Sequence, residues 1–205
     1  MMDAEAFLKL ETLRSRLLID LPPLTPQRSD YDLNPQARPA VPRVLRPSAV
    51  LIPIVARPQP TILFTRRSIG LKRHAGQVSF PGGAADPGDA SLTETALREL
   101  REETGIDPAL VTVAGYCEAY ETVTGFAVLP VVGILSEGFT LAPDEREVDA
   151  VFEVPLAYLL DPANCHEEKS VINGSPRRFY VFDYRGHYIW GATAAMLKGL
   201  SGRLR

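Results

Sequence analysis

The segment from Arg98 to Ile106 limits what this chain can fold into more than any other stretch, because acidic and apolar residues recur in it with the period of a helix. At about 100° per residue, Glu99, Glu102 and Glu103 fall on one stripe of that helix. Small and apolar side chains occupy the adjoining face: Ala96, Leu97, Leu100 and Thr104. The helix therefore has to bury one side against another layer of the fold and present negative charge beside that contact.

Three carboxylates this close repel one another, and two arrangements relieve the repulsion. They stay solvated on a surface helix, or they bind a hard divalent cation such as Mg²⁺, which prefers oxygen ligands. Arg98 lies four residues before Glu102 and is placed to pair with it. The helix follows a glycine loop, Pro81-Gly82-Gly83, and glycines let the backbone approach a metal or a phosphate closely. Loop and helix together favour metal-assisted chemistry at a phosphorus centre.

The rest of the chain predicts strands with interspersed helices, which is typical of an α/β layered domain. We expect strands at 49–55, 61–65, 111–120, 126–135, 148–154, 178–184 and 187–190. We expect helices at 91–104, ended by Gly105, and at 155–160 and 192–200. Residues 1–47 form a separate segment, with an amphipathic helix over 4–19 and then a proline-rich arm. The predicted organisation is an N-terminal extension, residues 1–47, followed by one domain over 48–205.

Composition excludes some partners. With 45% hydrophobic and 23% charged residues and a net charge of -3, the chain resembles an ordinary globular protein with no global positive field. We therefore expect no nucleic-acid or membrane partner, and phosphate recognition through a local basic cluster. Charged residues interrupt the apolar N-terminus, so no signal peptide is predicted. Cys117 and Cys165 fit no metal-ligand spacing, and we expect reduced thiols and a cytoplasmic location.

Residues 98–106 resemble the second half of the Nudix box, Arg-Glu-hydrophobic-any-Glu-Glu-any-Gly-hydrophobic, at every fixed position. The first half departs from the box, since Asp89 stands in place of its Glu and eight residues separate Asp89 from Arg98. Residues 63–83 resemble the additional signature of the coenzyme A pyrophosphatases among Nudix hydrolases, with Phe64 for Leu and Lys72 for Arg. Members of that subfamily share the Asp and the extra residue. The chain is thus similar to this subfamily over about a fifth of its length.

This resemblance implies a Nudix α/β/α sandwich, with a mixed β-sheet between helices. It also implies Mg²⁺ or Mn²⁺ as cofactor, with Glu99 and Glu103 as principal metal ligands and Glu102 and the Gly82 carbonyl as further ones. Arg98 would orient the glutamates. The implied reaction is hydrolysis of the pyrophosphate bond of coenzyme A and its acyl derivatives to 3′,5′-ADP and 4′-phosphopantetheine.

The basic residues around the signature have two interpretations. Arg66, Lys72, Arg73 and His74 either form a charged, solvated loop or bind the phosphates of the substrate beside Gly82 and Gly83. Arg67 belongs to the same basic run. We expect the substrate-binding interpretation for those four side chains and the two glycines.

The general base is less well defined by the sequence. In several Nudix enzymes the base comes from a loop remote from the box. Here Asp144, Glu145 and Glu147 precede an expected strand, and Glu147 directly abuts it, so we expect Glu147 to be the base. One alternative is a solvated turn, with a carboxylate of the box as the base or the metal alone sufficing. The other is Glu145 in place of Glu147.

Two other functions remain open. One is a Nudix hydrolase for another nucleoside diphosphate-linked substrate, such as NADH or ADP-ribose. The other is a catalytically silent Nudix ligand-binding module, against which the three intact carboxylates argue. A second copy of the chain, forming a homodimer, is a further candidate partner.

Overall fold

The computed structural model describes residues 10–71, 74–172 and 174–205. Within them, a nine-stranded mixed sheet runs in the order β1-β7-β8-β2-β3-β4, with β5 beside β2, β6 beside β8 and β9 beside β3. Its strands are β1 (Arg28–Ser29), β2 (Arg46–Val55), β3 (Thr61–Arg67), β4 (Val78–Ser79), β5 (Gly82–Ala84), β6 (Val111–Tyr116), β7 (Tyr120–Glu121), β8 (Phe126–Leu135) and β9 (Val148–Pro155). A smaller antiparallel sheet contains β10 (His166–Ile172), β11 (Ser175–Tyr184) and β12 (His187–Trp190).

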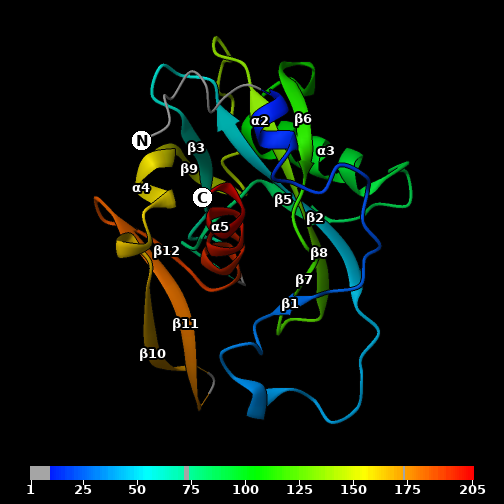
Figure 1. Ribbon diagram of the computed structural model, residues 1–205, viewed down its shortest axis with the longest axis vertical. Coiled ribbons are helices and arrows are strands. Elements are labelled where there is room, and N and C mark those ends of the chain that lie inside the picture. The colour runs from blue at the N-terminus through cyan, green and yellow to red at the C-terminus, as the bar shows by residue number, and fades with distance from the viewer. Residues whose placement is uncertain (1–9, 72–73, 173) are drawn as a thin grey trace.

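Helices flank the large sheet on both faces (Figure 1). They are α2 (Leu10–Arg14), α3 (Leu92–Thr104), α4 (Leu156–Leu160) and α5 (Gly191–Leu204), with short 3-10 turns at Pro35–Ala37, Pro108–Leu110 and Pro162–Asn164. The mixed sheet between helices confirms the expected α/β Nudix-type sandwich. No helix in the described part of the chain is long and apolar enough to cross a membrane.

The side chains of β2 alternate between the two faces of the sheet, so this strand contributes to the hydrophobic cores on both faces. Ala49, Leu51 and Val55 pack with Leu100 of α3, while Ile52 and neighbouring residues face the other core, which includes α5. Because successive side chains point to opposite faces, the apolar run of this central strand is buried on both sides. α3 is thereby fixed against one face of the sheet, close to the glycine loop.

The N-terminal segment departs from its expected form. The described part of its helix ends at Arg14, not at residue 19, and residues 1–9 lie outside the described part. Leu18 instead exchanges backbone hydrogen bonds with Tyr116 of β6, at 3.0 and 2.8 Å. Leu13 and Leu17 are buried in the core beside α5, so this end of the extension packs on the sheet.

Candidate active site

Helix α3 is fixed at both ends. The Ser91 hydroxyl accepts a hydrogen bond from the backbone N–H of Glu94 (3.2 Å), which caps the start of the helix. Gly105 ends it with φ of 74°, the left-handed conformation that glycine adopts without a Cβ clash. The helix therefore begins and ends close to its expected limits, and its carboxylates have fixed positions.

The glycine loop lies directly against α3. A Cβ placed on Gly83 would come 2.3 Å from Oε1 of Glu99, and one on Gly82 would come 2.6 Å from the carbonyl oxygen of Ala49. Both glycines pair with β2, so the loop is the short strand β5. Only glycine allows the backbone to pass this close to both β2 and the Glu99 carboxylate.

Arg98 organises the acidic side chains. Its guanidinium donates from Nη1 to Glu99 (2.9 Å) and to Glu102 (2.8 Å), and from Nε to Asp89 (2.9 Å). The expected pairing of Arg98 with Glu102 is confirmed. The Arg98 guanidinium holds the pKa of Asp89 well below its usual range. Asp89 thus anchors the arginine, and it also accepts a hydrogen bond from the Thr95 hydroxyl at 2.7 Å.

Glu103 is the most buried of these acids, with 2% of its surface exposed. Its Oε2 accepts a hydrogen bond from Thr65 (3.2 Å), and its Oε1 lies 4.0 Å from Nη1 of Arg67. Burial, followed by the nearby Glu99 carboxylate, raises the pKa of Glu103 to about 8. Burial also raises the pKa of Glu99, against the stabilising effect of Arg98. The charged forms of both carboxyl groups are therefore disfavoured at this site.

Glu147 lies within electrostatic range of this cluster. Its charge contributes to the raised pKa values of both Glu99 and Glu103. Its backbone carbonyl accepts a hydrogen bond from the N–H of Ser68 (2.8 Å), which fixes the end of the loop before β9. Glu145 and Glu147 are both exposed, and of the two Glu147 directly precedes β9. Glu147 is therefore better placed than Glu145 to act near the cluster.

Across the described ranges, no three acidic, His or Cys side chains already converge closely enough to hold a metal ion. Arg98 lies among Glu99 and Glu102 instead. To share a cation with Glu103, those carboxylates would have to turn from the guanidinium towards the ion.

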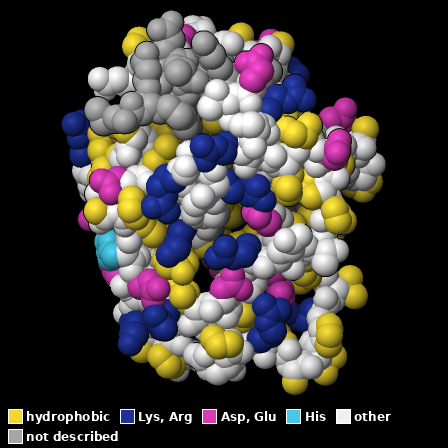
Figure 2. Space-filling view, in the orientation of Figure 1, with side chains coloured by type: hydrophobic (Ala, Val, Ile, Leu, Met, Phe, Trp, Pro, Cys, Tyr) yellow, Lys and Arg dark blue, Asp and Glu magenta, His cyan; other side chains and the backbone are white. Residues whose placement is uncertain are grey.

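A cleft of about 600 Å³ opens beside the cluster. Arg67 and Gly82 line it at the glycine loop, and residues of the extension, β4, β11, β12 and α5 form its other walls. This volume falls within the range of small-molecule sites, roughly 300–1,000 Å³. Figure 2 shows a hollow near the middle of one face with Lys and Arg side chains around it, so basic charge is local although the net charge is -3.

The expected substrate-binding residues are not all at this cleft. His74 lines it and hydrogen-bonds through Nδ1 to Gln77 (2.8 Å). Arg66 is exposed and is not among the lining residues, while its neighbour Arg67 is, because adjacent strand residues point to opposite faces. Lys72 and Arg73 lie outside the described residues. The alternation of side chains along β3 favours Arg67 over Arg66, and the basic run alone does not distinguish the two.

Comparison with known proteins identifies the family. The model of the NUDIX domain matches residues 45–173. Proteins named "Uncharacterized Nudix hydrolase NudL" from Salmonella paratyphi B and Salmonella newport are 47% identical over 156 residues, 76% of this chain and 81% of theirs. The crystal structure of DR0079 from Deinococcus radiodurans has a similar fold, with a TM-score of 0.50 and 14% identity over 80% of this chain and 87% of that one. The chain belongs to the Nudix hydrolase family.

Proposed function

We propose that this Nudix hydrolase cleaves the pyrophosphate bond of coenzyme A and its acyl derivatives, releasing 3′,5′-ADP and 4′-phosphopantetheine or its acyl form. The observation that carries the proposal is the position of Arg67. Among the described residues its buried Nε has no hydrogen-bond partner, although the side chain lines the cleft next to Glu103. A pyrophosphate in the cleft would attract the guanidinium, and a shift of the side chain towards it would let a phosphate oxygen satisfy this donor. The signature over residues 63–83 supports coenzyme A as that substrate.

The residues present fit a hard divalent cation. All candidate donors are oxygens, and the burial and mutual repulsion that raise the pKa values of Glu99 and Glu103 would be relieved by a cation. The missing Cβ of Gly83 leaves the Glu99 carboxylate free to approach the loop. Glu99 and Glu103 would be the main ligands of Mg²⁺ or Mn²⁺, with Glu102 and the Gly82 carbonyl as further ones. When bound, the ion supplies charge neutralisation at the pyrophosphate and acidifies a water molecule.

The chain's own side chains would position the reactants. Arg98 keeps Glu99 and Glu102 together through the hydrogen bonds of its guanidinium, and the two carboxylates would turn from it to bind the ion. Arg67 would bind the pyrophosphate, and Lys72, Arg73 and His74 are proposed as further phosphate contacts, whereas Arg66 does not line the cleft. Glu147 is the proposed base that removes a proton from the attacking water. Since phosphoryl transfer depends mainly on positioning and charge, few other groups are required.

Product analysis after incubation with coenzyme A and Mg²⁺ tests the proposal. Formation of 3′,5′-ADP and 4′-phosphopantetheine, abolished by EDTA and restored by Mg²⁺, is the expected result. A parallel panel contains NADH, ADP-ribose and nucleoside triphosphates. Faster cleavage of any of these compounds than of coenzyme A would refute coenzyme A as the main substrate. Binding without hydrolysis of any of the compounds would indicate a catalytically silent binding module. A cytoplasmic location and a homodimer remain predictions.

A further inference from the structure

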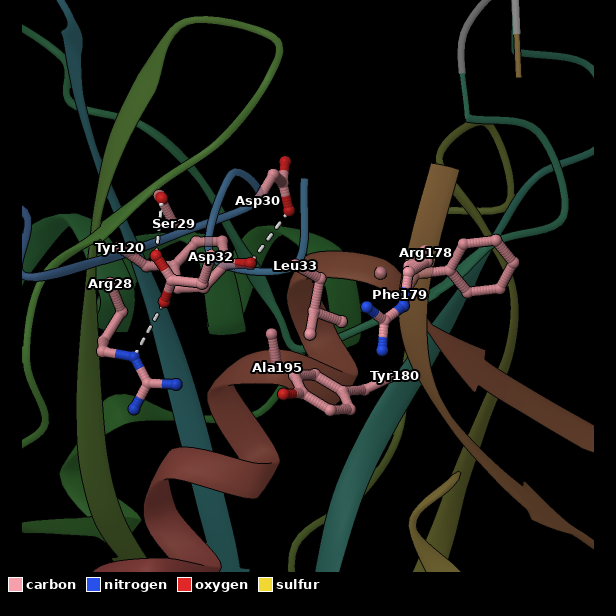
Figure 3. A pocket seen from close by; sticks show the side chains of 11 residues that line it. Arg28, Ser29, Asp30, Asp32, Leu33, Tyr120, Arg178, Phe179, Tyr180 and Ala195 are labelled. Atoms are coloured by element: carbon pink, nitrogen blue, oxygen red, sulfur yellow. Dashed lines mark hydrogen bonds and ion pairs between the residues drawn. The ribbon is translucent and has the colours of Figure 1, made fainter. Parts of the chain in front are cut away.

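One face of β11 contributes a distinct wall of the cleft. Ser175, Arg177 and Phe179 line it from one face of the strand, together with Trp190 of the neighbouring strand β12, and Arg178 also borders the cleft. Figure 3 shows Phe179 on the opposite side of β11 from Arg178 and Tyr180, as strand alternation requires. Arg177 therefore shares its face of the small sheet with the two aromatic rings.

The two rings are paired but not enclosed. Phe179 and Trp190 have centroids 5.0 Å apart at an interplanar angle of 59°, and both side chains are only half-buried. The neighbouring Val181 on the same face is wholly buried, so the rings lie at the edge of the core and not inside it. Aromatic surface that lines a cleft in this way suits a flat π-system such as a nucleobase.

Arg177 is available to a ligand, whereas Arg178 is engaged. The Arg178 guanidinium is ion-paired with Glu167, and its backbone N–H and C=O are held by the side chain of Asn34 at 2.8 and 2.9 Å. Among the residues that the structure describes, no acceptor lies within hydrogen-bond or ion-pair distance of the Arg177 side chain. Its interaction with Asp30 is a longer-range attraction.

Asp30 is the acid whose charge acts on Arg177 at this wall. Its carboxylate accepts hydrogen bonds from the Tyr120 hydroxyl (2.9 Å, Figure 3) and from the backbone N–H of Val123 (2.7 Å). Each of its oxygens thus accepts one hydrogen bond, and these bonds fix the position of the carboxylate. The fixed carboxylate attracts the Arg177 guanidinium towards the cleft.

Three arginines line the cleft, and Arg178 is ion-paired with Glu167. The other two are Arg67 beside the acidic cluster and Arg177 at the β11 wall. We propose that Arg177, Phe179 and Trp190 form the subsite for the 3′-phosphoadenosine half of the substrate. Arg177 binds the ribose 3′-phosphate, and the aromatic pair contacts the adenine. The inference rests on the proposed function for the identity of the substrate, and it gives the substrate a direction in the cleft, with the pantetheine leading away from β11.

Ligand binding can be measured without turnover, because Trp190 is the single tryptophan of the chain and its fluorescence reports on this wall. Titration of the full-length protein with adenosine 3′,5′-bisphosphate should change that fluorescence and should give a dissociation constant about tenfold lower than that of 5′-AMP. Equal affinity for the two nucleotides, or a response to 4′-phosphopantetheine in place of the bisphosphate, would overturn the assignment.

Substitutions then identify the residue that reads the phosphate. Arg177→Gln should remove the preference for the bisphosphate, Arg177→Lys should retain part of it, and the matched neighbour variant Arg178→Gln should leave it unchanged. Phe179→Leu should weaken both nucleotides alike. Loss of the preference in Arg178→Gln but not in Arg177→Gln would refute the proposal. Because Arg177 is partly exposed, its variants should fold, and circular dichroism checks this.

The steady-state assay separates this inference from the proposed function. Arg177→Gln should lower kcat/KM for coenzyme A about tenfold and leave the value for 3′-dephospho-coenzyme A within twofold. If the wild type hydrolyses coenzyme A but Arg177→Gln lowers kcat/KM equally for both substrates, the subsite is refuted and the proposed function stands. Absence of hydrolysis would refute the proposed function, and the fluorescence titration would still decide whether the subsite exists.

Discussion

Gly83→Ala provides a sharp test of the carboxylate cluster. The added Cβ would lie 2.3 Å from Oε1 and 2.6 Å from Cδ of Glu99. Ordinary contact needs roughly 3.5 Å, so the carboxylate has to move by about 1 Å. The obstacle is the flexible end of a side chain, and Gly83 does not have a left-handed φ. The backbone should therefore tolerate alanine while Glu99 turns out of position.

The expected cost falls on catalysis. A displacement of about 1 Å in a catalytic group reduces rates by about 100-fold. We expect a loss of that order in turnover of coenzyme A with Mg²⁺ at saturating substrate. The melting temperature should change little, since replacing a glycine by alanine in an allowed conformation usually stabilises by about 0.4–1 kcal/mol.

Gly88→Ala is the matched control. It lies in the loop between β5 and α3, and its Cβ would meet only the Asp86 carboxylate at 3.4 Å. This variant should keep wild-type turnover. If Gly83→Ala also turned over at the wild-type rate, displacing the Glu99 carboxylate would have no effect on catalysis, and its role as a metal ligand would be refuted.

Four further outcomes are expected. Glu99→Gln should cut turnover severely with little loss of fold, and isothermal titration should show weaker Mg²⁺ binding; undiminished binding would remove it from the metal site. Because burial raises the pKa of Glu103 from 4.5 to about 8, the folded protein keeps this proton where the unfolded chain has lost it, and stability falls as pH rises between these two values. Calorimetry in EDTA should therefore find that Glu103→Gln gains stability relative to the wild type between about pH 4 and pH 9, and an equal difference at both would contradict the raised pKa. Glu147→Gln should lose the acidic limb of the pH–rate profile at saturating Mg²⁺ and keep substrate affinity; an unchanged profile would exclude it as the base, and Glu145 would be tested next. Asn34→Ala leaves two backbone groups of Arg178 without these partners and should lower the free energy of unfolding by about 1–3 kcal/mol, measured by urea titration.

Local pattern predicted the regular elements well. The strand over 126–135 has its expected limits because a glycine turn precedes an apolar run, and α3 has clear capping residues. The strand His166–Ile172 was missed, since it is an edge strand whose charged side chains are exposed on both faces and show no alternation. The loop at Gly82 is a short strand because glycine there permits pairing with β2, which propensity does not favour.

Part of the candidate site could likewise be predicted from local sequence, and part could not. Glu99, Glu102 and Arg98 are close in sequence on one helix, so their spacing predicts their contacts. Arg177 approaches the cleft only through tertiary packing, as does Asn34 of the extension. Such positions depend on how distant segments meet, and a single sequence contains no local signal for that.

The packing of Leu13 and Leu17 bears on where an independently folding unit begins. The family model starts at residue 45 and the sequence pattern changes near 47, yet Leu13 is fully buried against the sheet and Asn34 ties the extension to β11. A polypeptide shortened to residue 45 would uncover apolar surface and remove one wall of the cleft. Protease nicking within the proline-rich arm should accordingly leave the two fragments associated, because buried contacts and not chain continuity hold the extension in place.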